Sequence, residues 1–484
     1  MTKAEKENKE NKVPSWVMDI AKAVETEGTA LDMRAVTLNS SKNGIEYAVT
    51  TGSVSLDLIT GGGWAPGRAV SVFGPEQSGK STDAWETLAW NLLRGTVCFI
   101  FDTEQALDAD YIDRIIYKVT GNNMEYYLGE IDYEEKKIIK PGLLYYFQPN
   151  VGEDVFRMIN RVLSVIPDVI HSKKKGWCWA RQGKTKKDYK LEPRDIEGAI
   201  SALVIIDSLA HMVPEAKEDD DTKNPLGAVA RMLSQELPKT INRVAKKRCT
   251  ILYTNQIRNK IGVMFGNPED EVGGNAPKFA SSQRLRFQAV ATSNVEKIFI
   301  TSGSRDKEDG TDVDMEPSWN NDGYDKYRYA KVKVKKNKLF SPHQSCWVRY
   351  RFESAGHPGD GLDESFDVYQ YLYMTGQCSK KTGKGLSISL LGVSQDKGIP
   401  EKLIPFLGDK IGKEEKKKKD KKKKSKEKEI ASFDRKLTWL EFKELVENPE
   451  RKHALRSLCT RQIKSGYAFG LYFEMKNEKN KEEE

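Results

Sequence analysis

Hydrophobic residues in the middle of the chain gather into four short runs. The runs cover 69–73, 97–101, 203–206 and 250–253. Continuous apolar runs of this length predict strands that are buried on both faces of a sheet. Asp102 follows the second run, Asp207 the third, and Asn255 with Gln256 the fourth. Because the carboxyl ends of parallel strands meet at one edge of a sheet, we expect these polar side chains to lie close together.

Apolar residues at helical spacing lie between and beyond these strands. Residues 81–93 follow the first strand after a glycine-rich loop, and 14–36 carry Trp16 and Ile20 at helix spacing. Another helical pattern covers 437–463. Strands that alternate with helices predict an α/β fold with a mostly parallel central sheet, preceded here by an N-terminal helical segment.

Three polar segments interrupt this pattern. Residues 121–140 and 172–190 are rich in lysine and tyrosine, and 305–326 are dense in Asp, Gly and Asn. We interpret all three as surface insertions, because a buried loop would leave its backbone polar groups without partners. Residues 413–429 form a lysine-rich run that is typical of a solvated linker. The other interpretation is a flexible arm that captures duplex DNA through counterion release.

Composition narrows the class of protein. The 484 residues are 38% hydrophobic and 31% charged, and no apolar run approaches the roughly 20 residues that span a bilayer. The N-terminus has no signal-peptide pattern. Six scattered cysteines without a CxxC pair favour reduced thiols over zinc. We therefore expect a cytoplasmic protein without a membrane partner. A net charge of +8 agrees with a nucleic-acid partner, although much of the excess lies in the lysine run.

The glycine-rich segment after the first strand carries the clearest chemistry. Residues 74–81 read GPEQSGKS, which fits the phosphate-loop pattern G-x-x-x-x-G-K-[ST] between a strand and a helix. Glycines allow the backbone N–H groups to surround phosphate oxygens, and the helix N-terminus favours negative charge. An accidental glycine turn would not need this strand and helix. We predict ATP binding by Gly74, Pro75, Glu76, Gln77, Ser78, Gly79, Lys80, Ser81 and Thr82.

Other polar residues complete a hydrolytic site around this loop. Lys80 should reach the outer phosphates, and Ser81 should bind Mg²⁺ with help from Asp207. Glu104 could orient the attacking water, or it could cap a helix. For Asp207 the magnesium contact is the preferred interpretation, and a generic Asp that only ends its strand is the alternative. Gln256 could sense the γ-phosphate, which from the strand pattern alone is a guess.

A resemblance to a known family adds to this interpretation. Residues 254–268, TNQIRNKIGVMFGNP, closely resemble the DNA-binding loop of bacterial RecA recombinases. Further matches follow in family order from about residue 48 to 340, namely 51–53, 74–76, 106–108, 273–276, 278–279 and 336–338. The resemblance implies a RecA-like phosphate-loop ATPase core with a small C-terminal α+β domain.

The resemblance also implies roles for individual residues. Glu104 is similar to the catalytic glutamate, Tyr111 to the residue that stacks on adenine, with Asp108 beside it, and Gln256 to the glutamine that couples nucleotide to DNA. The DNA loops would include Gly227, Arg231, Arg258, Lys260, Met264, Phe265, Gly273, Gly274 and Asn275. Lys278, Phe279 and Arg284 would lie at the subunit interface. Lys336 and Lys338 would reach the ATP of a neighbouring subunit. For Met264 and Phe265 alone, core packing would be the simpler interpretation.

Departures from the family pattern mark a divergent member, such as one carried by a virus or phage. Pro238 stands where the family usually has a basic residue, and 218–221 are acidic, which weakens the expectation of DNA contacts from the first loop. We predict five regions: a disordered start and helical oligomerisation segment (1–45), the ATPase and DNA-binding core (46–345), the first part of the C-terminal domain (346–412), the lysine-rich linker (413–429), and a C-terminal helical part with a charged tail (430–484).

The resulting hypothesis is an ATP-dependent recombinase. It would form a homo-oligomeric helical filament on single-stranded DNA, pair that strand with homologous duplex DNA, and hydrolyse ATP for turnover. Two alternatives use the same core: a DNA helicase, and a mediator that binds ATP and DNA without catalysis. The RecA-like DNA loop opposes the first, and Glu104 with the paired lysines opposes the second.

Overall fold

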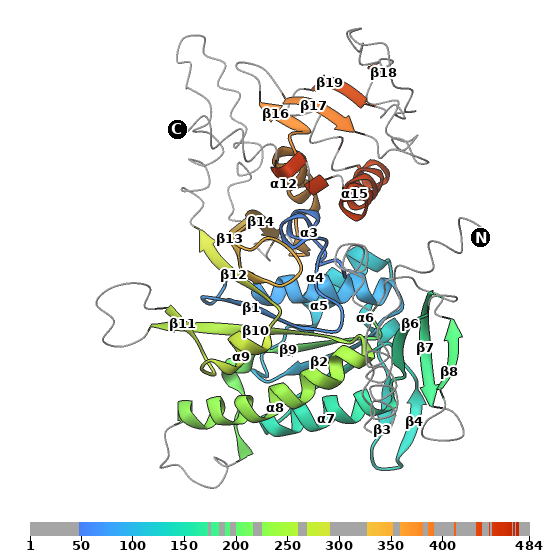
Figure 1. Cartoon of the computed structure of the whole chain (residues 1–484), viewed down its shortest axis with the longest axis vertical. Coiled ribbons are helices and arrows are strands. Elements are labelled where there is room, and N and C mark those ends of the chain that lie inside the picture. Colours follow the sequence, from blue (N-terminus) through green and yellow to red (C-terminus); the bar gives the residue numbers. More distant parts are fainter. Residues whose placement is uncertain are drawn as a thin grey trace, which may run out of the picture.

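The computed structural model in Figure 1 describes the core and parts of the C-terminal region. The described residues are 48–172, 176–182, 189–193, 200–215, 225–259, 269–290, 327–351, 359–380, 386–391, 411–412, 432–437, 445, 448–466, 468–469 and 471–473. The predicted N-terminal helix, the insertion at 305–326 and the lysine-rich run lie outside them. No helix in the described ranges is long and apolar enough to cross a membrane.

A ten-stranded sheet organises the core. Nine strands follow the order β15-β14-β13-β12-β1-β10-β9-β2-β5, and β11 pairs with β10 beside this path. The strands are β1 (Ala69–Gly74), β2 (Val97–Asp102), β5 (Leu144–Phe147), β9 (Ala202–Asp207), β10 (Thr250–Asn259), β11 (Glu269–Glu271), β12 (Gln283–Val290), β13 (Tyr327–Asn337), β14 (Ser345–Arg351) and β15 (Gly361–Leu362).

All four strands predicted from the apolar runs are present, and they are neighbours. β1, β10, β9 and β2 pair in parallel, so their carboxyl ends lie at one edge of the sheet. Asp102 pairs in register with Asp207, and Gly74 with Gln256. The prediction of a mostly parallel α/β sheet is therefore confirmed, and of its polar strand ends Asp102 and Asp207 lie side by side, whereas Asn255 and Gln256 lie next to β1.

Helices cover both faces of this parallel half, as Figure 1 shows. On one face lie α4 (Lys80–Leu93) and α5 (Ala109–Thr120), and on the other α7 (Gly152–Val165) and α8 (Pro225–Lys247). Alternate residues of one strand enter different cores: in β9, Leu203 and Ile205 pack toward α4, whereas Val204 and Ile206 pack toward α7 and α8. Burial on both faces explains why the strand sequences are apolar throughout.

The other half of the sheet is antiparallel, with one face in the core and the other partly exposed. On that second face Tyr329 and Arg349 are buried, at the start of β13 and the end of β14. β12 pairs with β13, β13 with β14, and β14 with β15, all antiparallel. Along β13, Ala330, Val332 and Val334 are buried in the core that includes α4, whereas Lys331 and Lys333 are exposed. This alternation is the period-two pattern of a strand that has one face in water.

The smaller elements lie around the sheet. Next to it lie α3 (Val54–Thr60), α6 (Met124–Tyr127), α9 (Ala276–Ala280) and the 3-10 helix η1 (Leu209–His211). Two of the predicted insertions contain antiparallel strands: β3 (Glu130–Asp132) pairs with β4 (Lys137–Lys140), and β6 (Asp168–Ser172), β7 (Gly176–Gln182) and β8 (Tyr189–Pro193) form a three-stranded sheet. The first hairpin is largely exposed, in agreement with a surface position.

The C-terminal region packs over the α3 side of the core (Figure 1). It contains α12 (Glu364–Met374), α15 (Pro449–Lys464) and a small antiparallel sheet of β16 (Cys378–Lys380), β17 (Leu386–Leu391), β19 (Ser432–Leu437) and β18 (Ile411–Gly412). The central sheet continues through β14 and β15, beyond the domain boundary expected at residue 345. Of the helical pattern predicted over 437–463, residues 449–463 lie in α15 and Leu437 ends β19, whereas 438–444 and 446–447 lie outside the described residues.

The packing of the phosphate loop against β14 can be tested by a substitution at Gly79. Gly79 has φ +88°, and a Cβ there would overlap the buried Tyr350 ring of β14. We expect Gly79→Ala to lower the free energy of unfolding by roughly 2–4 kcal/mol, because left-handed backbone and overpacking both oppose the side chain. Urea titration without nucleotide measures the change.

A second glycine supplies the control. Gly95 also has positive φ (+73°), but a Cβ there would meet nothing within 4 Å. Gly95→Ala should therefore show the backbone cost alone, about 1 kcal/mol. Equal destabilisation by the two substitutions would mean that Tyr350 does not restrict the loop.

Candidate functional site

The phosphate loop connects β1 directly to α4. Gly74 ends β1, and Gly79 caps the N-terminus of α4 in a left-handed conformation. A Cβ on Gly74 would overlap the carbonyl of Phe287 in β12, so the loop backbone lies directly against two antiparallel strands. The N-terminus of α4 thereby faces the edge where the parallel strands end, which is the geometry that favours an anion.

Lys80 lies at the centre of the loop. Its Nζ donates a hydrogen bond to the Pro75 carbonyl at 2.5 Å, and the Ser78 hydroxyl donates to the same oxygen at 2.8 Å. Burial lowers the pKa of Lys80, whereas the carboxylates of Asp207, Glu104 and Glu76 counteract that shift. A phosphate chain in the loop would likewise favour the charged ammonium.

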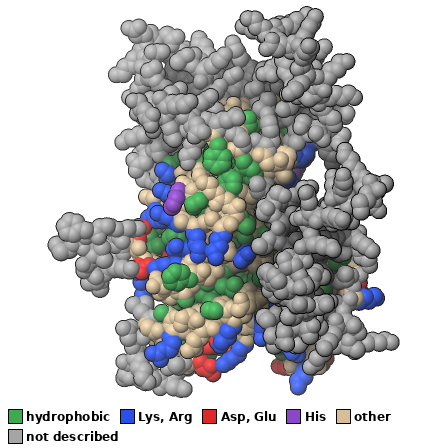
Figure 2. All heavy atoms as spheres, in the orientation of Figure 1, with side chains coloured by type: hydrophobic (Ala, Val, Ile, Leu, Met, Phe, Trp, Pro, Cys, Tyr) green, Lys and Arg blue, Asp and Glu red, His purple; other side chains and the backbone are tan. Residues whose placement is uncertain are grey.

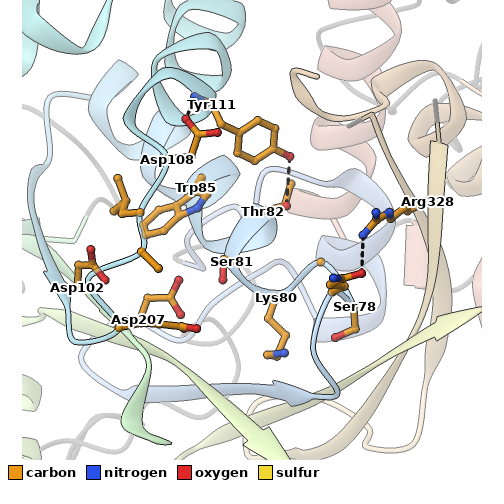
Figure 3. Close-up of a pocket in the computed structure, with 15 residues that line it drawn as sticks. Ser78, Lys80, Ser81, Thr82, Trp85, Asp102, Asp108, Tyr111, Asp207 and Arg328 are labelled. Carbon is orange, nitrogen blue, oxygen red and sulfur yellow. Dashed lines mark hydrogen bonds between the residues drawn. The ribbon is translucent and has the colours of Figure 1, made fainter. Parts of the chain in front are cut away.

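Ser81 and Asp207 face each other beside this lysine (Figure 3). Burial raises the pKa of Asp207, and hydrogen bonds from the Thr254 and Ser81 hydroxyls and the charge of Lys80 oppose the shift. A hydroxyl and a carboxylate are oxygen ligands of the kind that Mg²⁺ accepts, together with water and phosphate oxygens. The residues present therefore fit a magnesium ion at Ser81 with Asp207 nearby.

Glu104 and Tyr111 lie on the loop and helix that follow β2. Glu104 Oε2 is 3.5 Å from His211 Nδ1, and that nitrogen is 2.9 Å from the Ser208 hydroxyl. The Tyr111 hydroxyl is 3.2 Å from the Thr82 hydroxyl at the start of α4. The contact brings α5 onto the phosphate loop, although Tyr111 is 29 residues away in the sequence.

These side chains surround one cavity of about 320 Å³, a size suited to a small ligand. Figure 3 shows the arrangement. The cavity is lined by Gln77, Ser78, Gly79, Lys80, Ser81, Thr82, Trp85, Asp102, Glu104, Ala106, Leu107, Asp108, Tyr111, Asp207 and Arg328. Of the residues predicted to act on the nucleotide, Gly74, Pro75, Glu76, Gln256, Lys336 and Lys338 are not among them.

Three residues at this site were missed by the sequence analysis. Trp85 lies one turn into α4, and helix periodicity alone would place it in the core. His211 follows Asp207 by four residues, but nothing in the strand pattern places it beside Glu104. Arg328 is the second residue of β13, far from the loop in sequence, and its one available signal is that it occupies an inward position of an alternating strand.

Gln256 connects the nucleotide loop to the predicted DNA loop. It lies on β10 in register with Gly74, and its carbonyl accepts a hydrogen bond from Val272 N at 3.2 Å. β10 then continues to Asn259 and pairs with β11. Arg258 is exposed on this strand. Lys260, Met264 and Phe265 lie outside the described residues, so only the base of their loop is described.

Ion pairs hold that base against neighbouring elements. Three consecutive acids of β11 each contact a different cation: Glu269 contacts Arg286 on β12, Asp270 contacts Lys278 on α9, and Glu271 contacts Arg284 on β12. The Arg284 guanidinium also lies 5.0 Å from the ring centre of Phe73, at the end of β1.

The remaining DNA-loop residues meet near α9. Gly227 and Arg231 are exposed on the first turns of α8. Gly273, Gly274 and Asn275 form the turn between β11 and α9, and a Cβ on Gly274 would touch Ala230 of α8. The structure thus brings the two predicted DNA-binding segments side by side. Pro238, the departure from the family pattern noted in the sequence, lies inside α8.

The predicted interface residues form a second group. Phe279 is 77% exposed on α9, and the Lys336 ammonium donates to the carbonyl of Lys278 at 2.8 Å. Burial and the charges of Lys338 and Arg284 lower the pKa of Lys336. Figure 2 shows Lys and Arg side chains gathered in a row across the displayed face. Clustered cations of this kind favour an anionic partner.

The coupling free energy between Glu269 and Arg286 can be measured by a double-mutant cycle. The guanidinium contacts both carboxylate oxygens, at 2.6 and 2.9 Å, and both side chains are largely buried. We expect Glu269→Gln and Arg286→Gln to show a coupling of roughly 1 kcal/mol in the free energy of unfolding.

The Glu236–Lys239 pair on α8 supplies the control for this cycle. Lys239 Nζ lies 2.8 Å from Glu236 Oε1, and the lysine side chain is 64% exposed. Its coupling should be about 0.3–0.5 kcal/mol, because solvent screens exposed pairs. A Glu269–Arg286 coupling no larger than this would show that the pair does not hold the base of the loop.

Comparison with known proteins agrees with the geometry. A family model described as the RecA N-terminal domain matches residues 22–135 and 194–307. The break at 136–193 contains β5, α7 and the three-stranded sheet β6–β8. The chain is 34% identical to Protein RecA of Agrobacterium fabrum over 256 residues, which cover 52% of this chain and 55% of that relative.

A longer match is found with Protein RecA of Geobacter sulfurreducens. It is 32% identical over 319 residues, which cover 65% of this chain and 70% of the relative. Against the first relatives the chain spans only 55% to 58% of their length. A crystal structure of the RadB recombinase aligns with 65% of this chain at 17% identity and a TM-score of 0.36, a likeness too weak to support an argument.

Proposed function

Because this chain belongs to the RecA family, we propose that it is an ATP-dependent DNA recombinase. It would assemble into a helical filament on single-stranded DNA, pair that strand with homologous duplex DNA, and hydrolyse ATP to permit turnover. The observation that carries this proposal is the convergence of Lys80, Ser81, Glu104 and Asp207 on one cavity at the carboxyl edge of the parallel sheet.

Each of these side chains has a role in the proposed hydrolysis. The loop backbone and Lys80 would bind the phosphates, and Ser81 with Asp207 would hold Mg²⁺, which neutralises charge on the phosphate oxygens. Glu104 would orient the attacking water from the opposite wall. Tyr111, anchored to Thr82, would lie against the adenine. Gln256 would sense the γ-phosphate, because its strand runs beside Gly74 and leads directly into the DNA loop.

DNA binding is supported by charge on the antiparallel half of the sheet. Lys331, Lys333 and Lys335 point to the face of β13 opposite the buried core, and Arg286 lies in register with Lys333. The charges of Lys333 and Arg286 contribute to a lowered pKa of Lys335, after burial. A polyanion bound here would relieve that repulsion, which gives salt-sensitive and sequence-tolerant binding.

Filament formation is supported by the position of the paired lysines. Lys336 and Lys338 are not among the residues that line the chain's own cavity, and Lys336 lies beside the exposed Phe279. Cations with this position could complete the ATP site of a neighbouring subunit. Each site would then be complete only between two subunits.

The proposal is tested by two experiments on the full chain. Electron micrographs on single-stranded DNA with a non-hydrolysable ATP analogue should show filaments. A strand-exchange assay should show joint molecules with a homologous duplex and ATP, and none with a heterologous duplex. Rings in the micrographs would instead favour a helicase, and no assembly would oppose the filament.

The phosphate loop itself is tested by Lys80→Ala. Loss of the ammonium removes the charge that would contact the outer phosphates, so we expect ATP hydrolysis to fall at least 100-fold, as for the loss of a transition-state contact. Filament extension should also be lost. Measured phosphate release at the rate of the unaltered chain would refute the assignment of this site.

The DNA loop is tested by Phe265→Ala. We expect stimulation of the ATPase by single-stranded DNA to weaken about 10-fold, because stacking of an aromatic side chain on a base contributes about 1–3 kcal/mol. Nucleotide affinity without DNA should stay the same. Tyr133→Ala, which removes a 73% exposed aromatic from the β3–β4 turn, is the matched control. Equal stimulation in both variants would mean that the loop is misplaced.

A further inference from the structure

We propose that Arg328 is a nucleotide-binding residue that contacts the phosphate chain of ATP in the chain's own site. The inference rests on the proposed function, and it adds to the site a cation from the antiparallel half of the sheet. Unlike Lys336 and Lys338, which would act on a neighbouring subunit, Arg328 would act within one subunit.

The strand register directs Arg328 toward the loop. Arg328 pairs with Tyr350 of β14 in antiparallel register, so the two side chains lie on the same face of the sheet. That face is the inner one, because Tyr350 is fully buried beneath Gly79. Ala330 and Val332 continue the same face further along β13 and are buried in the core.

Arg328 is therefore a cation at an inward position of a strand whose charged residues Lys331 and Lys333 lie exposed on the other face. At the next inward positions, Ala330 and Val332 are buried in the core that includes α4. At the start of the strand the sheet passes the phosphate loop instead, and the guanidinium enters the cavity that Lys80 and Ser81 also line (Figure 3). The desolvation cost of placing the guanidinium here is small, because the Arg328 side chain remains exposed to solvent.

A direct contact with the loop supports the assignment. Arg328 Nη1 donates a hydrogen bond to the Gln77 side-chain oxygen at 3.0 Å. Gln77 lies between Gly74 and Gly79, in the stretch whose backbone N–H groups would surround the phosphates. Its backbone is left-handed, with φ +54°. A phosphate chain in the loop would lie within the same cavity as the guanidinium.

Guanidinium chemistry suits this ligand. Arginine presents several N–H donors in one plane, so it can keep the bond to Gln77 and still donate to a phosphate oxygen. Such charge-assisted bonds are about twice as strong as neutral ones. Mg²⁺ neutralises only part of a triphosphate, so a second cation opposite Lys80 would strengthen binding of the charged nucleotide.

The test measures the affinity of the full chain for a fluorescent ATP analogue without DNA, at protein concentrations too low for filaments. We expect Arg328→Gln to raise the Kd about 10-fold, and Arg328→Lys to raise it less, because the charge is kept. Arg243→Gln, which removes an exposed arginine near the end of α8, should stay within twofold of the unaltered chain.

Salt dependence separates contact with phosphate from support of the loop. If the guanidinium meets phosphate, its loss should make the Kd less sensitive to salt between about 0.05 and 0.5 M, because one screened charge pair has been removed. An equal increase in Kd at every salt concentration would mean that Arg328 only positions the Gln77 side chain through its hydrogen bond. That result would contradict the proposal.

The outcomes also distinguish this inference from the proposed function. If the unaltered chain does not bind the analogue, the proposed ATP site is wrong and the role of Arg328 falls with it. If the unaltered chain binds, Lys80→Ala does not, and Arg328→Gln binds within twofold of the unaltered chain, the ATP site stands and only the inference about Arg328 is overturned.

Discussion

The structure depends on the close approach of the phosphate loop to the antiparallel strands. Gly74 lies against the Phe287 carbonyl of β12, and Gly79 lies against the Tyr350 ring of β14, with no room for a Cβ at either position. The loop therefore cannot change shape without moving these strands. Because β12 and β13 also carry the cations proposed to meet DNA and the neighbouring subunit, this contact is the physical basis for coupling nucleotide to the remaining surfaces.

A second constraint holds the C-terminal region to the same helix. Arg456 of α15 stacks 4.1 Å from the ring centre of Trp90 on α4 and donates to the Gly52 carbonyl at 2.5 Å. On the same helix, Glu86 accepts hydrogen bonds from Lys118 at 2.5 Å and from Leu362 N at 2.8 Å. Burying such charges is unfavourable unless they are paired and hydrogen-bonded. These polar contacts thus specify how α4, and with it the phosphate loop, sits in the fold.

Much of the parallel half could be predicted from the sequence, because its signals are local. Four apolar runs ending in polar residues specified both the strands and the edge of the sheet where Asp102 and Asp207 lie side by side. The phosphate loop followed from a motif of eight residues. These features depend on neighbours along the chain, so a single sequence contains them.

The rest could not be predicted, because it depends on partners distant in sequence. Arg328 meets Gln77 across 251 residues, and His211 meets Glu104 across more than a hundred. The acids of β11 resemble an ordinary solvated turn until β12 and α9 place a cation opposite each one. The strands of the two insertions were missed for a different reason: their apolar residues stand side by side, as Ile138 with Ile139 in β4 and Trp177 to Trp179 in β7, in runs too short to mark a strand.

Strand β13 connects the chain's own nucleotide cavity to the surface proposed to meet a neighbouring subunit. Arg328, near the start of the strand, lies at the chain's own cavity; Lys336, near its end, lies beside Phe279, and Lys338 follows the strand. At about 3.4 Å per residue it covers roughly 30 Å between these ends. Hydrogen bonds to β12 and β14 along most of its length make it a stiff connection. If Arg328 binds the phosphates of one ATP and the lysines reach the next, a single strand spans two sites, and occupation of one site would set the position of the cations offered to the other.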